Sequence, residues 1–238
     1  MESRKVAAVI LAAGQGKRMQ SSVQKQYLLL EGHPILYYSL KIFEESPVDD
    51  IILVTGQSEI AHCREEIVEH YGFQKVSAIV AGGKERYHSV YAGLKAVKEA
   101  GYVLIHDGAR PFVTQEIISR TLEGARGSGA CVAGMPVKDT IRLLDEYGDP
   151  EITPDRERVW MMQTPQTFSF PLIYDAYQKL MELEQSGHAV SVTDDAMVLE
   201  TMIGKKITLT EGSYENIKIT TPSDLKIAEA FCVTKSCL

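Results

Sequence analysis

Apolar and polar positions follow two rhythms along this chain. Short continuous apolar runs occupy residues 6–11, 51–54, 76–80, 102–105 and 130–135, and apolar residues recur at helical spacing over residues 59–71, 87–99 and 114–126. Strand-sized runs that alternate with helical segments predict a parallel sheet with helices on both faces. Runs without in-out alternation are typical of strands that are buried on both sides. The pattern therefore predicts an α/β fold with a Rossmann-like, mostly parallel sheet flanked by helices.

The alternation breaks between residues 136 and 165. Two β-prone pieces, 139–143 and 158–161, flank a polar turn at 148–150 and are typical of a long hairpin. Such an arm exposes Trp160 and Met161, and exposed apolar surface usually needs a partner. We therefore expect a homodimer, with a hairpin that folds back on its own chain as the alternative. Helical spacing returns at residues 170–185, 196–203 and 222–231, so residues 1–238 are expected to form a single domain with a β-arm at about 137–163.

Composition narrows the class of protein. The 238 residues are 45% hydrophobic, enough for one large core, and no run of about 20 apolar residues or signal-peptide pattern occurs. A formal net charge of −7 disfavours a nucleic-acid-binding protein. Cys63, Cys131, Cys232 and Cys237 lack the spacing of a metal site, so they are expected to be reduced thiols. We expect a cytoplasmic protein that binds neither membranes nor nucleic acid.

The loop after the first apolar run has the composition of a phosphate-binding site. Ala12-Ala13-Gly14-Gln15-Gly16-Lys17-Arg18-Met19 follows the run directly, and Lys25 comes shortly after it. Small residues let backbone N–H groups approach phosphate oxygens, and the basic side chains supply positive charge. The spacing matches neither the dinucleotide fingerprint nor the Walker A motif. A plain strand-to-helix turn with solvated basic residues remains the alternative.

A second glycine turn is expected at the same edge of the sheet. Gly82 and Gly83 follow an apolar run and precede a helical segment, where Ser89 could bind a base or a sugar. The alternative is a helix start whose serine faces solvent.

Polar residues also follow the run at 102–105, at the edge where α/β sheets bind ligands. Asp107 is the best candidate for a carboxylate that holds Mg²⁺ together with phosphate oxygens. In the alternative, Asp107 caps a turn and pairs with Arg110. His106 is expected to be a structural residue and is assigned no role in the chemistry.

Two further segments carry polar candidates. Lys218 lies in an apolar, β-prone run and is expected to bind an anion or, alternatively, to point to water from an edge strand. Asp194 and Asp195, which follow Thr193, are expected first to cap a helix and second to line the site.

Taken together, these motifs resemble a known enzyme family. The first loop with Lys25-Gln26, Gly-Gly-x-x-Arg-x-x-Ser-Val, His-Asp-Gly-Ala-Arg-Pro, Pro-Val-Lys-Asp-Thr, Gln-Thr-Pro-Gln, Thr-Asp-Asp-Ala and Asn-Ile-Lys-Ile-Thr-Thr-Pro occur in order between Ala12 and Pro222. In this they resemble the 2-C-methyl-D-erythritol 4-phosphate cytidylyltransferases of isoprenoid biosynthesis. Two positions depart from the family pattern: Leu11 stands where many members have proline, and Gly108 where alanine is frequent.

The resemblance implies a nucleotidyltransferase with Mg²⁺ as its cofactor. The substrate phosphate would attack the α-phosphorus of CTP and release pyrophosphate, a reaction that needs charge neutralisation more than a covalent intermediate. Arg18, Lys25 and Lys218 match the catalytic residues of the family.

The resemblance also assigns binding residues. CTP would lie against Ala12, Ala13, Gly14, Gly16, Gly82, Gly83, Ser89, Asp107 and Gly108. The polyol phosphate would contact Asp107, Arg110, Thr140 and Arg156, with the last two acting from the arm in the partner subunit's site.

Two other functions remain open. A ribitol 5-phosphate cytidylyltransferase resembles this chain in the same loops, and the acceptor depends on a few hydrogen bonds that one sequence places poorly. The second alternative is a regulator that binds the nucleotide without turnover. The presence of both Lys25 and Lys218 favours an enzyme.

Overall fold

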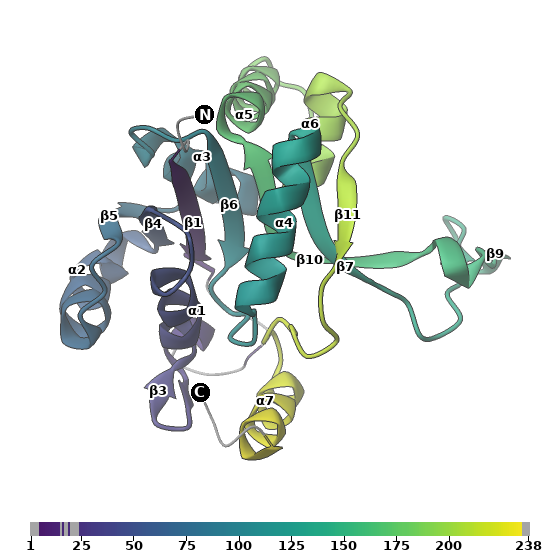
Figure 1. Cartoon of the computed structure of the whole chain (residues 1–238). Helices are drawn as coiled ribbons and strands as arrows, with labels where there is room; N and C mark the ends of the chain where they lie inside the picture. Colours follow the sequence, from purple (N-terminus) through teal and green to yellow (C-terminus); the bar gives the residue numbers. More distant parts are fainter. Residues whose placement is uncertain (1–4, 15, 17–18, 20–23, 235–238) are drawn as a thin grey trace.

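The computed structural model describes residues 5–14, 16, 19 and 24–234. A seven-stranded sheet forms the centre of the molecule, with helices on both faces (Figure 1). Its strands are, in spatial order, β11 (Thr208–Glu211), β7 (Ala130–Pro136), β10 (Trp160–Ser169), β6 (Tyr102–Asp107), β1 (Val6–Ala12), β4 (Asp50–Thr55) and β5 (Val76–Ala81). β10 runs antiparallel to β6 and β7, and the other neighbouring pairs are parallel. The predicted α/β fold with a mostly parallel sheet is confirmed.

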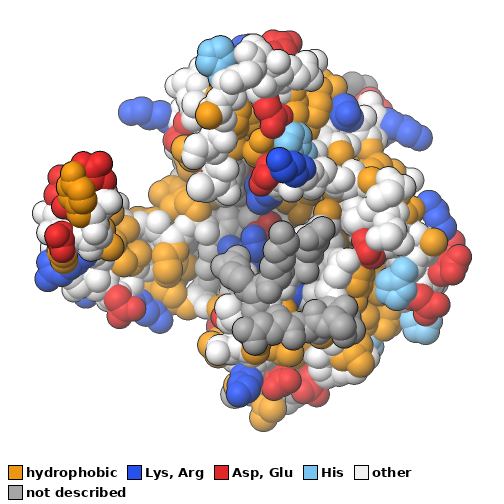
Figure 2. All heavy atoms as spheres, turned by 180° about the vertical axis from the view of Figure 1, so that it is seen from behind, with side chains coloured by type: hydrophobic (Ala, Val, Ile, Leu, Met, Phe, Trp, Pro, Cys, Tyr) orange, Lys and Arg blue, Asp and Glu red, His pale blue; other side chains and the backbone are white. Residues whose placement is uncertain are grey.

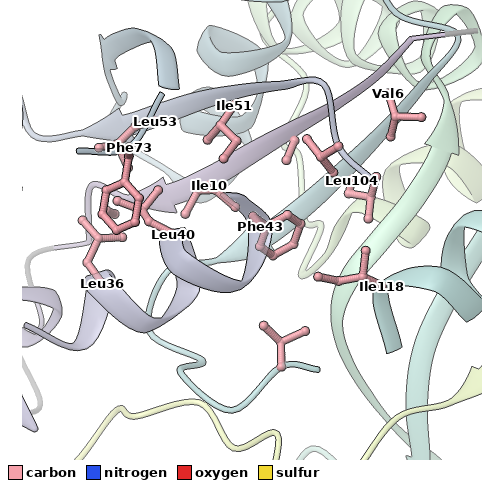
Figure 3. Packing of buried hydrophobic residues seen from close by; sticks show 14 of the residues in the cluster. Val6, Ile10, Leu36, Leu40, Phe43, Ile51, Leu53, Phe73, Leu104 and Ile118 are labelled. Carbon is pink, nitrogen blue, oxygen red and sulfur yellow. The ribbon is translucent and has the colours of Figure 1, made fainter. Parts of the chain in front are cut away.

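One face of the sheet packs against α1 (Ile35–Glu44), α4 (Gln115–Ser128), and the short α2 (Ile60–His62) with the π-helix that continues it (Cys63–Glu69). Figure 3 shows the core of this face, where Val6 and Ile10 of β1 pack with Leu40 and Phe43 of α1. The sequence pattern predicted the helical segments at 59–71 and 114–126 but missed α1. The core packing, which the local sequence does not reveal, is what favours a helix there.

The other face packs against α3 (Arg86–Ala96), α5 (Phe170–Gln185) and α6 (Asp195–Ile203). Ala7 and Val9 of β1 point to this face, so the apolar run of β1 is buried on both sides, as its unbroken hydrophobicity predicted. Helix α3 approaches the sheet closely at Gly93, where a Cβ atom would lie 2.4 Å from Cγ1 of Val9.

An arm projects from the sheet between β7 and β10 (Figures 1 and 2). It contains β8 (Leu143–Leu144), β9 (Pro150–Ile152) and the 3-10 turn η5 (Arg156–Arg158), and Leu143 pairs with Ile152. The arm itself was expected, but both of its expected hairpin strands, 139–143 and 158–161, are wrong. Residues 139–142 form no strand, and the strands that pair in the arm are the shorter β8 and β9. Trp160 already belongs to β10 and pairs with Pro136 of the main sheet, because β7 and β10 stay hydrogen-bonded up to the base of the arm.

A third apolar cluster attaches the C-terminal helix α7 (Pro222–Thr234) to the N-terminal end of α1. Helix α7 begins at Pro222, the first residue of the predicted segment. Thr221 and Asp224 cap this end: Thr221 Oγ1 accepts from the N–H of Asp224 at 3.4 Å, and the Asp224 carboxylate accepts from the N–H of Thr221 at 2.8 Å. None of the helices in the described part of the chain is both long and apolar enough to cross a membrane. Cys63, Cys131 and Cys232 are buried free thiols, and Cys237 lies outside the described residues.

Candidate active site

A pocket of about 530 Å³ opens where β1 and β6 end. Its walls come from the loop after β1, the 3-10 turn η2 (Lys25–Tyr27), the start of α3, the end of β6 and the segment before α7. Lys and Arg side chains lie within a hollow of the face that Figure 2 shows. The predicted site residues among its lining are Ala12, Ala13, Gly14, Gly16, Lys25, Gly83, Ser89, Asp107 and Lys218. Chain segments far apart in sequence thus meet at the sheet edge where α/β proteins bind ligands.

The loop after β1 turns back at Gly16, whose φ of +62° lies in the left-handed region that favours glycine. The N–H of Met19 donates to the carbonyl of Gly16 at 2.8 Å, and the buried Met19 side chain joins the cluster beneath α7. Lys17 and Arg18, the other predicted basic residues of this loop, lie outside the described residues.

Lys25 lines the pocket from the turn η2, which hydrogen bonds hold on both sides. Gln26 is buried and donates through Nε2 to the carbonyl of Ala12 at 2.6 Å. On the other side, the Tyr27 hydroxyl lies 2.9 Å from Oγ1 of Thr55 and 3.0 Å from Sγ of Cys63. Burial raises the pKa of Tyr27, so this hydroxyl stays protonated and can donate. The backbone that bears Lys25 is therefore fixed to the ends of both β1 and β4.

The second glycine turn packs directly on the first. A Cβ atom on Gly82 would lie 2.5 Å from Cβ of Ala13 and 2.7 Å from Oγ of Ser89, so only glycine fits without a shift. The Ser89 hydroxyl accepts from the N–H of Gly83 at 3.1 Å and donates to the carbonyl of Glu85 at 3.3 Å. Ser89 therefore closes the turn at the start of α3 and also lines the pocket. Its side chain is buried, so the alternative of a helix-start serine that faces solvent is wrong.

Asp107 is surrounded by three cationic side chains. Lys218 Nζ lies 2.8 Å from its Oδ2, Arg110 Nε 3.7 Å from the same oxygen, and Arg86 Nε 3.4 Å from Oδ1. Burial alone would raise the pKa of Asp107, but Arg86, Lys218 and Arg110 outweigh it and hold this pKa well below its usual range. Asp107 is thus an ionised carboxylate in a pocket whose lining carries four other cationic side chains, Lys25, Lys84, Arg86 and Lys218, and one other acidic residue, Glu85.

Lys218 lies in irregular backbone, so the β-strand expected around it is wrong. The segment is anchored by other contacts: Ile219 N–H donates to the carbonyl of Ala109 at 2.9 Å, and Arg110 Nη1 donates to the carbonyl of Asn216 at 2.7 Å. The Thr220 hydroxyl donates to the carbonyl of Lys218 at 2.9 Å. Because Lys218 binds Asp107, the alternative of a lysine that points to water from an edge strand is wrong as well.

His106 has the structural role that was expected of it. It is fully buried, lies 5.0 Å from the Phe43 ring, and its Nε2 lies 3.3 Å from the carbonyl of Arg110. Its Nδ1 lies 3.0 Å from Oγ1 of Thr164, which accepts from the N–H of Asp107. A neutral ring with the proton on Nε2 satisfies all of these partners. Burial lowers the pKa of His106 to about 3, which agrees with a neutral ring.

Other predicted site residues lie outside the pocket lining. Gly108 is beneath it, where a Cβ atom would come within 2.8 Å of Cδ1 of Leu36. Arg110 reaches the site only through Asp107 and Asn216. Thr140 and Arg156 are exposed on the arm, away from the pocket of their own chain, and Arg156 donates to the carbonyl of Lys138 at 3.2 Å.

Some lining residues had no predicted role in the site. Gln26 and Arg86 are the most informative of these, and the others are Leu11, Lys84, Glu85 and Ala109. Gln26 follows Lys25 directly, and Arg86 lies in the second glycine motif, so position within a motif was the available signal. Asp194 caps α6 as expected, since it accepts from the N–H of Met197 at 2.9 Å. Asp195 is buried and binds Arg86 instead of lining the pocket.

The described residues contain no group of three or more histidine, cysteine or acidic side chains that could hold a metal ion. A divalent cation at this site would therefore need ligands from a bound phosphate compound in addition to Asp107.

Comparisons with known proteins show the family of this chain. The family model described as 2-C-methyl-D-erythritol 4-phosphate cytidylyltransferase matches residues 6–234. Enzymes of that name from Lachnoclostridium phytofermentans and Lachnospira eligens are 48% and 50% identical to this chain. The first alignment covers 95% of this chain and 95% of the relative, and the second covers 94% and 97%.

Solved structures show the same fold. The 4-diphosphocytidyl-2C-methyl-D-erythritol synthase from Anaerococcus prevotii superposes with a TM-score of 0.84 at 32% identity, over 97% of this chain and 96% of that one. The 2-C-methyl-D-erythritol 4-phosphate cytidylyltransferase from Thermus thermophilus gives a TM-score of 0.76 at 30% identity, over 96% and 99%. The identity and the near-complete coverage show that this chain belongs to the 2-C-methyl-D-erythritol 4-phosphate cytidylyltransferase family.

Proposed function

We propose that this protein converts CTP and 2-C-methyl-D-erythritol 4-phosphate to 4-diphosphocytidyl-2-C-methyl-D-erythritol and pyrophosphate. The observation that carries this proposal is one pocket that joins a glycine loop, Lys25, Asp107 and Lys218 in a chain of this family. One oxygen of the substrate phosphate forms a bond to the α-phosphorus of CTP. The bond from that phosphorus to the oxygen bridging to the β-phosphorus breaks, and pyrophosphate leaves with the electron pair.

The catalytic residues in this proposal act by charge. Negative charge spreads over the phosphate oxygens in the transition state, and preorganised cations at fixed positions stabilise it. Lys25 and Lys218 reach the pocket from opposite ends of the chain. Arg18 is proposed to act with them from the first loop. No protein nucleophile is required, because the acceptor phosphate is itself the nucleophile.

CTP binding is proposed to depend on the two glycine turns, so their packing is testable. In Gly82→Ala, the new Cβ atom meets Ala13 and Ser89, and the turns must separate. We expect the Kd for CTP to rise about tenfold, which corresponds to ~1.4 kcal/mol. Isothermal titration calorimetry measures this constant. Gly127→Ala on α4 is the control, because nothing lies within 4 Å of its Cβ position, and a similar Kd for both variants would contradict the proposed contact.

Mg²⁺ is proposed as the cofactor, held mainly by the phosphates of CTP. Asp107 fits as its protein ligand because it is ionised, lines the pocket and has about four lone-pair positions, of which the three cations leave room for another partner. When bound, Mg²⁺ would neutralise charge on the phosphate oxygens. The residues of the chain supply the remaining positive charge and the orientation of the triphosphate.

A homodimer formed through the arm is also proposed. Apolar side chains of the arm are exposed: Leu143, Leu144, Tyr147 and Ile152, of which Tyr147 is 83% exposed. Contact with a second copy would remove this surface from water. In such a dimer, Thr140 and Arg156 would contact the substrate phosphate in the partner subunit's pocket.

The dimer is tested by changing the two arm residues that face each other. We expect Leu143→Asp combined with Ile152→Asp to sediment as a monomer of 26.4 kDa, and the unchanged protein as a dimer. Two carboxylates in an apolar contact would be buried without partners, which disfavours association. Leu209→Asp is the control, since Leu209 is similarly exposed on the distant β11. Sedimentation of the unchanged protein as a monomer at micromolar concentration would rule out the arm-mediated dimer.

A cytoplasmic location is proposed as well. Cys63, Cys131 and Cys232 are free and buried, which is compatible with a reducing compartment.

The function itself is tested by pyrophosphate release. CTP and Mg²⁺ are offered with 2-C-methyl-D-erythritol 4-phosphate or ribitol 5-phosphate, and ATP, GTP and UTP replace CTP in parallel. We expect release with CTP and methylerythritol phosphate, its loss with EDTA, and its return with excess Mg²⁺. A preference for ribitol 5-phosphate would keep the chemistry and change the acceptor. No release with either acceptor would favour a regulator that binds CTP without turnover.

A further inference from the structure

A buried carboxylate behind the pocket binds one of the pocket's cations. Asp195, at the start of α6, is fully buried and does not line the pocket. Its Oδ1 and Oδ2 each accept a hydrogen bond of 2.8 Å from the two terminal nitrogens of Arg86. The Tyr177 hydroxyl of α5 donates to Oδ1 at 2.6 Å. The bidentate geometry restricts the guanidinium to one orientation.

The Gln166 side chain in turn holds the backbone of Asp195. Oε1 of Gln166 on β10 accepts from the N–H groups of Asp195 and Ala196, at 3.1 and 2.9 Å. Nε2 of Gln166 donates to the neighbouring Asp194 at 2.9 Å. Residues from α5, α6 and β10 therefore fix the Asp195 carboxylate. A solvent-exposed ion pair is not held by such a hydrogen-bond network.

Arg86 connects this carboxylate to the site. Its two terminal nitrogens bind Asp195, and its third nitrogen, Nε, lies 3.4 Å from Oδ1 of Asp107. Oδ2 of Asp107 binds Lys218 at 2.8 Å. The charges thus alternate along the row Asp195, Arg86, Asp107, Lys218, which runs from the interior to the proposed catalytic lysine.

Geometry explains why Arg86 binds Asp195 with two nitrogens and Asp107 with only one. A guanidinium prefers to bind a carboxylate with two nitrogens. Without Asp195, both terminal nitrogens of Arg86 would be free to bind Asp107, the carboxylate that also holds Lys218. Because Asp195 engages them, Arg86 offers only Nε, to Oδ1 of Asp107. Oδ2 then keeps its short contact of 2.8 Å with Lys218, while Arg110 Nε lies farther from it, at 3.7 Å.

We infer that Asp195, supported by Tyr177, is a positioning residue for the reaction: it holds Arg86 so that Asp107 keeps Lys218 oriented in the pocket. The inference rests on the proposed function, since Lys218 acts in that reaction. Asp195 touches no substrate in this arrangement and acts only through Arg86.

The kinetic test uses Asp195→Asn in full-length protein with CTP, methylerythritol phosphate and Mg²⁺. The substitution leaves every pocket cation in place, so ground-state attraction for the nucleotide is kept while the orientation of Lys218 is lost. We expect kcat to fall about ten- to a hundredfold, as is typical for loss of a residue that orients a functional group. The KM for CTP is expected to change by less than about threefold.

A second comparison removes Arg86. If Asp195 acts through Arg86, then Arg86→Gln and the double variant Arg86→Gln/Asp195→Asn should have the same kcat within about twofold, because coupled residues are not additive. Independent, multiplying losses in kcat would overturn the inference.

Matched controls separate positioning from folding. Asp175→Asn removes a charge from the surface pair with Lys179 on α5 and should keep full activity. Leu180→Ala, in the buried face of α5, lowers the melting temperature without touching Arg86 and should keep its kcat per folded molecule. If Asp195→Asn behaved like Leu180→Ala, with a lower melting temperature and an unchanged kcat, Asp195 would be structural only.

A milder pair covers the case in which Asp195→Asn does not fold. Tyr177→Phe removes one hydroxyl that touches Asp195 and should lower kcat about two- to tenfold, in line with the loss of one hydrogen bond to a charged group. Tyr174→Phe removes a hydroxyl from the same helix, away from Asp195, and should leave kcat unchanged. Equal kcat for these two variants would overturn the inference. Absence of turnover in the unchanged protein would instead refute the proposed function, so the two failures are distinguishable.

Discussion

Lys218→Ala is expected to lower kcat about 10²- to 10³-fold, equivalent to about 3–4 kcal/mol of transition-state stabilisation. The KM for CTP should change by less than about threefold, because the charge on the reacting phosphate is greatest in the transition state. Nζ of Lys218 reaches the pocket on irregular backbone and is oriented by Asp107 at 2.8 Å. Steady-state pyrophosphate release gives kcat and KM, and calorimetry gives the affinity for CTP.

A large loss of kcat with little change in KM is expected for Lys25→Ala as well, since Lys25 also lines the pocket. Lys226→Ala is the control for both, because Lys226 is an exposed lysine of α7 a short distance along the chain from Lys218. Equal losses in turnover and CTP affinity would show that the two lysines bind the ground state and do not act in the transition state.

The second large effect is a loss of folding stability in acid, caused by the buried His106. Its pKa is about 3 in the folded protein, because burial disfavours the charged ring, and 6.5 is the ordinary value. The unfolded chain therefore takes up a proton at this position before the folded protein does. The stabilisation is fully present above pH 6.5 and is lost progressively as the pH falls toward 3. At about 1.4 kcal/mol for each pH unit, ~3 kcal/mol should be lost by pH 4.5 and about 5 kcal/mol by pH 3.

This effect is measured by urea unfolding between pH 7.5 and 4.5. His106→Asn should be less stable than the unchanged protein at pH 7.5 but should depend less on pH, so the two curves should converge in acid. Phe43→Leu is the control, since it alters the ring that packs on His106 and adds no titrating group. Its stability curve should run parallel to that of the unchanged protein. A parallel curve for His106→Asn would contradict the role of His106 in acid unfolding. Asp107 contributes in a separate window, below its ordinary pKa of 3.8, because its pKa is lowered.

Hydrophobic patterns predicted the elements correctly where the hydrophobicity of the side chains matches their burial in the structure. Helix α5 was predicted over the residues that form it, and the run of β1 indicated burial on both faces. Helix α1 and strand β10 were harder to predict from the sequence. The sequence of α1 is rich in aromatic and β-branched residues with modest helix propensity, and its helical form depends on packing against β1. Much of β10 looks polar because Gln163, Thr164 and Gln166 satisfy buried partners from other segments.

For the site, the sequence by itself determined which residue types were available: two glycine turns, an aspartate after a buried strand and lysines near both ends of the chain. It also placed most of them at one edge of the sheet, because parallel strands present their carboxyl ends together. Only the tertiary structure decided which charges face each other. Asp107 meets Arg86 and Lys218 across 21 and 111 positions of sequence, and Asp195 reaches Arg86 across 109. Such pairings depend on the distance between side chains after the helices have packed on the sheet, and local sequence carries no record of that distance.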